Sequence, residues 1–276
     1  MSEFTHYQLG ELRFTRVEYL SLPVPGELIG LSDEQVSKVS WLAEPWVQDD
    51  QVVISANAWF SEAAGEKVVF DPVQAVDVVL RADEAAEQEH QQALHDKFTA
   101  AGFAPDEITK VLLTHIEGVG MVAKREAGQW LPFFPNAKIM ISDVQLSAFE
   151  ESLKTADAET LAYPTTICWQ ALIEQGVIET YQDGQELVPG ITAEITGEHC
   201  DGHSVFHICG GETTFIGHLA VSPAHMATGP CEALNEHPEA SYAALHRIAA
   251  DGRNLIGPLW PAPAMGCWRD DQLVAS

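Results

Sequence analysis

The chain has 276 residues, enough for one large hydrophobic core or two small ones. Hydrophobic residues make up 46% of it and charged residues 20%, which is ordinary for a soluble globular protein. No apolar run approaches the roughly 18–20 residues that a membrane-spanning helix requires. The first residues, MSEFTHYQLGELRF, lack the basic and apolar segments of a secretory signal, so we expect a cytoplasmic protein.

The charge of the chain is strongly acidic. Fourteen Lys and Arg residues stand against 41 Asp and Glu residues, which gives a formal net charge of −27 and a sequence pI near 4.5. Such a negative field repels phosphate backbones and anionic lipid surfaces, so we expect neither a nucleic-acid partner nor a membrane partner. Two interpretations stay open: the charge attracts cations or cationic substrates, or it only keeps the surface well solvated.

The first half of the chain mixes predicted strands with two predicted helices. Apolar residues at helical spacing predict an amphipathic helix over residues 82–101, ended by Gly102, and a second helix over about 144–155. Residues 64–66 are typical of a hairpin turn. Runs rich in β-branched and apolar residues predict strands at 11–24, 51–60, 67–71, 108–114 and 138–142.

The second half continues in the same way. Strands are expected at 176–181, 191–196, 204–209 and 213–218. A helix at about 238–251, a short strand at 253–257 and a proline-rich tail follow. Because the strands form meanders with helices between them, we expect α+β or α/β layers. No repeat or linker composition interrupts the sequence, so we predict a single domain over residues 1–276.

Four side chains that can bind a metal ion follow predicted strands: His115, Glu117, His199 and His218. Imidazole nitrogen and carboxylate oxygen suit Zn²⁺, Fe²⁺, Mn²⁺, Co²⁺ or Ni²⁺. A lone histidine at a strand end is more often a hydrogen-bonded structural residue than a ligand. The order in which these residues occur along the chain therefore carries more weight than any one of them.

Six segments, taken in order, resemble those of the metallo-β-lactamase superfamily, and most closely its lactonase and organophosphate-hydrolase branch. They are VVFDP (68–72), GFAPDEITKVLLTH (102–115), FPNAKIMIS (134–142), VPGITAEITGEHCDGHS (188–204), TTFIGHLAVSP (213–223) and GPLWPAP (257–263). The likeness covers roughly residues 50–265. It implies an α+β fold, the αβ/βα four-layer sandwich, with two mixed β-sheets face to face and helices on the outer faces.

The family's pattern has a His-x-His-x-Asp-His motif, a later turn histidine, an aspartate that bridges two metals, and a late histidine. His115 and His199 match the first motif histidine and the turn histidine. Glu117 stands at the second motif histidine, and His218 stands at the bridging aspartate. The resemblance therefore implies that the first metal site keeps four side chains able to bind a metal.

The positions of the family's second metal have lost their ligands. Val119, Gly120 and Leu259 stand there, and none can bind a metal through its side chain. Random decay would not obviously replace two ligands of the first site by two other ligands. We therefore expect one divalent transition metal (Zn, Fe, Mn, Co or Ni). The alternative is that the two exchanges misplace both groups and that no metal binds.

From this resemblance we predict a hydrolase-like enzyme that acts on a small-molecule substrate with one metal, which activates water. Because Val119 replaces the aspartate that handles the proton, the two-metal lactonase or phosphotriesterase mechanism is not expected. Three histidines and one glutamate also suit redox-active iron or manganese, so an oxygen-dependent or lyase-type reaction stays open. The alternative is a metal-free, non-catalytic ligand-binding or interaction scaffold on the same fold.

Several neighbouring residues are expected to be structural. Asp71 orients the strand-end loop through backbone amides, His203 matches the family's second turn histidine, and Cys200 is a buried, inert thiol rather than a ligand or nucleophile. His225 and His237 are expected at the surface. The stretch 42–50 is expected to be an ordinary surface loop. A pocket lid or the contact of a homodimer are its open alternatives.

Overall fold

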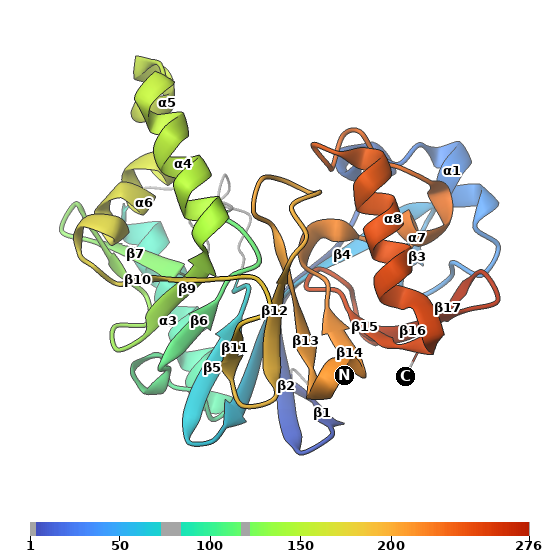
Figure 1. Ribbon diagram of the computed structural model, residues 1–276, viewed down its shortest axis with the longest axis horizontal. Coiled ribbons are helices and arrows are strands. Elements are labelled where there is room, and N and C mark those ends of the chain that lie inside the picture. Colours follow the sequence, from blue (N-terminus) through green and yellow to red (C-terminus); the bar gives the residue numbers. More distant parts are fainter. Residues whose placement is uncertain (1–3, 73–83, 117–121, 276) are drawn as a thin grey trace. The chain divides into compact units, whose positions relative to one another are not determined.

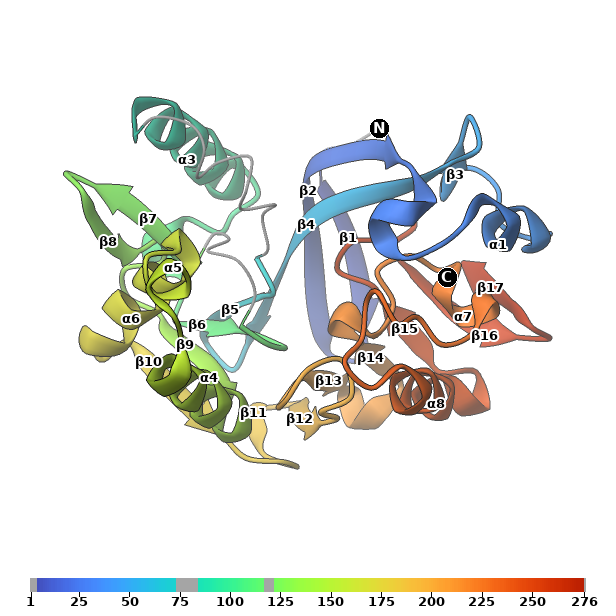
Figure 2. The same cartoon turned by 90° about the horizontal axis from the view of Figure 1, so that it is seen from above.

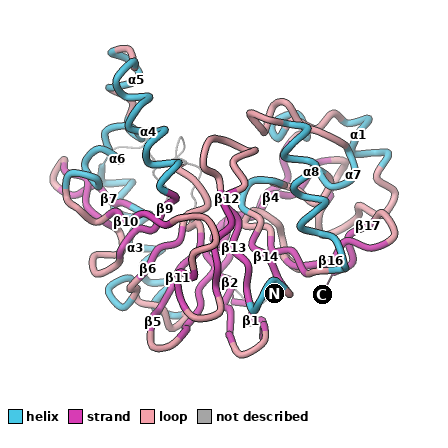
Figure 3. The backbone as a smooth tube through the Cα atoms, viewed as in Figure 1, coloured by secondary structure: helices cyan, strands magenta, loops and turns pink. Residues whose placement is uncertain are grey.

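In the computed structural model, helices separate groups of consecutive strands along the described residues, which are 4–72, 84–116 and 122–275 (Figure 3). The chain divides into two compact units. Unit 1 comprises Met1–Gln8, Leu12–Val17 and Ala58–Tyr181, and unit 2 comprises Leu9–Glu11, Glu18–Asn57 and Gln182–Ser276. Strands β2 (Leu12–Val24) and β4 (Gln51–Ala63) contribute residues to both units. The single domain over 1–276 stays a prediction.

The first sheet has the strand order β1-β2-β4-β5-β6-β9-β10, with β3 paired to β4. Strands β4 and β5 form an antiparallel hairpin, whereas β5, β6, β9 and β10 pair in parallel. Parallel strands end at the same edge of a sheet, so the residues that follow β5 and β6 lie close together. The remaining bounds are β1 (Phe4–Leu9), β3 (Val47–Gln48), β5 (Glu66–Phe70), β6 (Lys110–Leu112), β9 (Lys138–Ser142) and β10 (Ile178–Tyr181).

Helices and a small hairpin complete unit 1. Helices α3 and α6 contact the β7–β8 hairpin, and α4 contacts β9 and β10 (Figures 1 and 2). The hydroxyl of Ser142 accepts the backbone N–H of Gln145 at 3.0 Å, which caps α4. The bounds are α3 (Glu84–Ala100), the 3₁₀ turn η2 (Pro105–Glu107), β7 (Ala123–Glu126), β8 (Gln129–Pro132), α4 (Asp143–Thr155), α5 (Ala158–Leu161) and α6 (Pro164–Glu174).

The second sheet belongs to unit 2 and has the order β11-β12-β13-β14-β15-β16-β17. Its neighbours pair antiparallel except β14 and β15, which are parallel. The strands are β11 (Glu186–Val188), β12 (Ile191–Ile195), β13 (Ser204–Ile208), β14 (Thr213–Phe215), β15 (Asn254–Ile256), β16 (Met265–Arg269) and β17 (Gln272–Ala275).

The helices of unit 2 either precede the first strand of that sheet or lie between its strands. Helix α8 contacts both α7 and the 3₁₀ turn η5, so it braces the segment that follows β14. Among the described residues, no helix of either unit combines the length and the apolar character needed to cross a membrane. The elements are η1 (Gly26–Ile29), α1 (Asp33–Lys38), η4 (Cys209–Gly211), η5 (Gly217–Leu219), α7 (His225–Thr228), α8 (Pro238–Ala249) and η6 (Ala250–Gly252).

Most predicted elements are present, and the differences have local causes. The strand predicted over 213–218 ends at Phe215, because residues 217–219 turn into η5. The proline-rich tail holds an unpredicted hairpin, β16–β17. Its turn residues Asp270 and Asp271 have φ of 50° and 57°, a conformation that aspartate tolerates better than most residues. Asp270 and Asp271 separate two short strands, and the sequence on either side of them shows no pattern by which a strand could be predicted.

Candidate metal centre

His115 of unit 1 is held by a carboxylate through a threonine. It follows β6 and is only 6% exposed. Asp71, directly after β5, is buried, and its backbone N–H donates to the carbonyl of Leu112 at 2.9 Å. The Asp71 carboxylate accepts the backbone N–H of Thr114 at 2.7 Å and also the Thr114 hydroxyl. The predicted role of Asp71 is thus extended: it binds one backbone amide and one side-chain hydroxyl.

These bonds decide which nitrogen of His115 carries the hydrogen. Oγ1 of Thr114 lies 3.0 Å from Nδ1 of His115. Since the hydroxyl hydrogen of Thr114 goes to Asp71, Oγ1 accepts and Nδ1–H of His115 donates. The lone pair of the neutral ring is then on Nε2. Metal-binding histidines are oriented in this way, by a hydrogen bond from the other ring nitrogen.

His199 of unit 2 is held in the same tautomer by an amide. It lies half-buried in the loop between β12 and β13, with Nδ1 3.1 Å from Oδ1 of Asn235. That oxygen also accepts the hydroxyl of Ser241 at 2.8 Å, while the amide NH₂ of Asn235 donates to the carbonyl of Cys231 at 3.4 Å. The Cys231 carbonyl fixes the amide orientation, so Nδ1–H of His199 donates and Nε2 carries the lone pair.

His218 lies beside His199. It is 3% exposed, sits in η5, and its ring centroid is 5.6 Å from that of His199 at an interplanar angle of 78°. Two imidazoles bound to one tetrahedral ion through nitrogen–metal bonds of about 2.0–2.1 Å have centroids on the order of 5 Å apart. The spacing of these two rings therefore fits two ligands of one ion.

His203 is a supporting residue and not a ligand. It is fully buried, and Nδ1 lies 2.9 Å from Oγ1 of Thr196, whose hydroxyl donates to the backbone carbonyl of His203 at 3.1 Å. Nε2 accepts the backbone N–H of His218 at 3.3 Å. Burial, and then the nearby His199 and His218, hold the pKa of His203 well below its ordinary value. A neutral His203 thus anchors the turn that carries His218, as expected of a structural histidine.

The structure places the four predicted ligands as follows. His199 and His218 come together in unit 2. His115 belongs to unit 1, where the bonds above orient it. Glu117 lies outside the described residues, as do Val119 and Gly120.

Leu259, at the predicted place of a lost second-site ligand, is partly buried in unit 2. It packs against an apolar cluster, so the side chain at this position serves the core. The cluster comprises Ile29, Leu31, Val36, Val52, Val221 and Ala224.

Two expectations for neighbouring residues are wrong. His225 is buried, with Nε2–H donating to the carbonyl of Ile29 at 3.0 Å and Nδ1 accepting the N–H of Ser222 at 3.1 Å. Burial lowers its pKa. Its position after the fifth of the six segments predicts a surface residue, but α7 turns it into the core. Cys200 is half-buried rather than buried. His237 is exposed, as predicted.

No protein-family profile and no curated protein matches the chain. Solved structures match the chain over nearly its whole length. The hydrolase AbOPH of the β-lactamase superfamily has a TM-score of 0.71 and 18% identity, covering 100% of this chain and 98% of its own. The dizinc quorum-quenching lactonase AidC, in complex with a product, has a TM-score of 0.74 and 16% identity over 99% and 97% of the two chains.

A third structure is a probable metal-dependent hydrolase from Staphylococcus aureus. Its TM-score is 0.70 at 13% identity, over 98% of this chain and 99% of its own. At such low identities these likenesses show the fold alone. The α+β fold class predicted from the sequence, that of the metallo-β-lactamases, is confirmed.

Proposed function

On the metallo-β-lactamase fold, we propose that this chain is a metal-dependent, hydrolase-like enzyme that acts on a small molecule with a single metal ion. The proposed ligands are His115, His199 and His218, with Glu117 as the fourth on sequence grounds. The observation that carries the proposal is the tautomer of two rings. In both His115 and His199, Nδ1–H donates to an oxygen that is itself held in place, which puts the lone pair of each neutral ring on Nε2, the nitrogen proposed to bind the metal.

The donor set fits a first-row divalent ion. Three imidazole nitrogens and one carboxylate oxygen suit zinc, iron, manganese, cobalt or nickel, and zinc would bind them at about 2.0–2.2 Å. When bound, such an ion lowers the pKa of water and polarises a carbonyl or phosphoryl oxygen. The chain's own part is to hold the rings still: Asp71 and Thr114 orient His115, Asn235 orients His199, and His203 anchors the backbone of His218.

One ion, and not two, is proposed because of the side chains at the second site. Leu259 packs against an apolar cluster, and Val119 and Gly120 carry no donor atom in their side chains. A second dication there would be desolvated without ligands. Hydrolysis of homoserine lactones or organophosphates by a two-metal route is therefore expected to be weak, with kcat/KM below about 10⁴ M⁻¹s⁻¹.

The test is the metal content of the purified protein, joined to zinc titration of the apoprotein followed by its melting temperature. The wild type should hold one ion per chain and melt higher with metal. His199→Ala and His115→Ala should each abolish binding. His95→Ala, which removes an exposed histidine of α3, is the matched control and should bind as the wild type does. Cys200→Ser should also leave binding unchanged.

Two outcomes would contradict the proposal. Two ions per chain would show that the second site is intact. No ion in the wild type, with no melting shift on titration, would favour the alternative of a metal-free scaffold that binds a ligand or a protein partner.

A further inference from the structure

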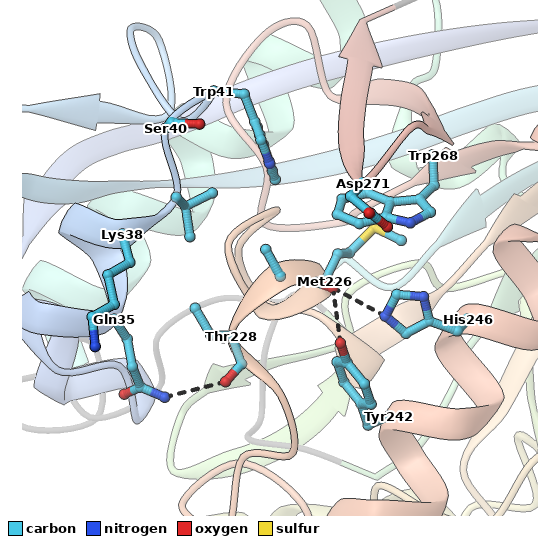
Figure 4. A pocket seen from close by; sticks show the side chains of 12 residues that line it. Gln35, Lys38, Ser40, Trp41, Met226, Thr228, Tyr242, His246, Trp268 and Asp271 are labelled. Atoms are coloured by element: carbon cyan, nitrogen blue, oxygen red, sulfur yellow. Dashed lines mark hydrogen bonds between the residues drawn. The ribbon is translucent and has the colours of Figure 1, made fainter.

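Unit 2 contains a second possible binding site, a cavity of about 510 Å³. This volume falls within the range of small-molecule pockets. Its walls come from α1 and the residues after it, from α7, from α8 and from the β16–β17 turn (Figure 4). Among the lining residues that the structure describes, neither His199 nor His218 of the same unit appears. The lining residues that matter below are Trp41, Trp268, Tyr242, His246, Lys38 and Asp271.

Four aromatic rings form a continuous wall. The ring centroids of Trp41 and Trp268 are 5.7 Å apart at an interplanar angle of 75°. His246 lies 5.6 Å from Trp268 at 83°, and Tyr242 lies 4.4 Å from His246 at 60°. Because successive rings are steeply inclined to one another, they enclose a corner and do not stack into a flat plate. A corner of this kind can surround a compact, rounded group.

The wall is fixed by hydrogen bonds to the backbone of α7. The carbonyl of Met226 accepts the Tyr242 hydroxyl at 3.3 Å and Nε2–H of His246 at 3.0 Å (Figure 4). On the opposite side, the side-chain amide of Gln35 donates to the carbonyl of Thr228 at 3.4 Å. A ligand would therefore find Tyr242 and His246 already in position, which reduces the entropy lost on binding.

The lining carries one charge of each sign, Lys38 and Asp271. The ammonium of Lys38 is directed to the carboxylate of Glu34 at 2.6 Å, in an exposed ion pair on α1. Asp271 is the carboxylate of the lining. The charge of Asp271 also acts on the aromatic wall. Burial raises the pKa of Tyr242, and the nearby charge of Asp271 raises it further. An anionic ligand would meet this carboxylate, whereas a cationic one would be attracted to it.

We propose that this cavity binds an organic cation, a substituted ammonium group, held by Trp41, Trp268 and Tyr242 and balanced by Asp271. Aromatic faces attract cations through their quadrupole, and a desolvated ammonium with several methyl groups also gains apolar contact. The formal net charge of −27 favours the same class of ligand, because it concentrates cations near the protein. This site is independent of the proposed metal centre.

The test uses two probes of nearly equal shape, choline and its neutral analogue 3,3-dimethylbutan-1-ol. Binding to the full-length protein is followed by tryptophan fluorescence and by calorimetry at constant ionic strength. Choline should bind saturably, and the neutral analogue should bind at least about tenfold more weakly. Equal binding of both probes would overturn the proposal, since it would show an apolar pocket only. Absence of saturable choline binding would refute it as well.

Two variants locate the binding site. Asp271→Asn removes the charge, and asparagine tolerates the positive φ of 57° at this turn as well as aspartate does. It should weaken choline binding about tenfold or more. Asp270→Asn changes the adjacent turn residue, whose φ is 50° and which does not line the cavity, and should bind choline as the wild type does.

Trp41→Leu tests the aromatic wall, with the melting temperature as the check on folding. It should weaken binding of choline much more than that of the neutral analogue. If neither Asp271→Asn nor Trp41→Leu changes choline affinity, the cation binds elsewhere and the assignment is wrong.

Discussion

His115 and His199 reach the same ring state by different chemistry. His115 is backed by a buried carboxylate acting through a hydroxyl, and His199 is backed by a neutral amide. A carboxylate makes the ring a stronger base, but its own buried charge requires full hydrogen bonding. An amide brings no charge, so errors in its placement are tolerated better. The two devices therefore predict different sensitivities to mutation.

The two supports also differ in origin. Asp71 and Thr114 follow the parallel neighbours β5 and β6, so the sheet itself places them together. Asn235 meets His199 only because the segment before α8 packs on the loop between β12 and β13; the backbone N–H of Glu236 donates to the carbonyl of His199 at 2.9 Å. The support of His115 therefore depends on the register of a sheet, whereas the support of His199 depends on how the segment before α8 packs.

The largest effect is expected from Thr114→Val, which keeps the shape and removes the hydroxyl. Thr114 is fully buried, so Asp71 would lose a donor and Nδ1 of His115 its acceptor. The free energy of unfolding should fall by about 2–4 kcal/mol, because a buried carboxylate is left under-bonded. Zinc affinity should fall about 10–100-fold. Urea unfolding and zinc titration measure the two quantities.

A nearby threonine provides the control. Thr109 directly precedes β6, at the opposite end of the strand from Thr114, and its hydroxyl donates to the carbonyl of Lys67 at 3.1 Å. Thr109→Val should lower the free energy of unfolding by about 1 kcal/mol and leave zinc affinity unchanged. If Thr114→Val destabilises the protein without changing zinc affinity, the hydroxyl does not orient a ligand.

A smaller effect is expected from Asn235→Ala. It removes the acceptor of His199 and leaves the Ser241 hydroxyl to find another partner. No buried charge is exposed, so the free energy of unfolding should fall by about 1–2 kcal/mol, and zinc affinity by roughly tenfold. Ser241→Ala keeps the acceptor and should change zinc affinity less than Asn235→Ala does. A loss of affinity with Asn235→Ala greater than with Thr114→Val would reverse the ranking of the two supports.

The sequence predicts one support much better than the other. Asp71, Thr114 and His115 stand at the ends of strongly apolar strands, where a continuous apolar run and the polar residues that follow it mark the edge of a sheet. Nothing local marks Asn235. It lies 36 residues after His199 in a segment without clear periodicity, and its role arises only when α8 packs.

The same limit explains the cavity and the misplaced histidine. Trp268 and Asp271 belong to a hairpin hidden in a proline-rich tail, and Tyr242 and His246 come from a helix whose partners are far away in sequence. His225 looks like a surface residue until tertiary packing covers it. Predictions held where a residue's environment is set by its own strand, and failed where it is set by distant segments.

The smallest effect is expected from a carboxylate that backs an imidazole at the surface. Glu194 on β12 lies 2.7 Å from Nε2 of His207 on β13, and Arg247 of α8 also pairs with it. The bond to His207, and then the Arg247 guanidinium, lower the pKa of Glu194 to about 2 from an ordinary 4.5. Because the folded pKa is the lower one, the pair stabilises the fold above about pH 4.5. That contribution is lost as the pH falls from about 4.5 towards 2.

Solvent limits this contribution, since the Glu194 side chain is 27% exposed. Glu194→Gln should therefore lower the free energy of unfolding at pH 7 by about 1 kcal/mol or less, and the difference from the wild type should vanish near pH 2. Melting curves between pH 2 and 7 measure it, and Glu179→Gln, which breaks a looser ion pair of 3.7 Å with Lys138, is the control. If Glu194→Gln lowered the free energy of unfolding as much as Thr114→Val does, the larger importance expected for the Asp71 carboxylate could not be attributed to its burial. The contrast between a buried and a partly exposed carboxylate behind an imidazole would then fail.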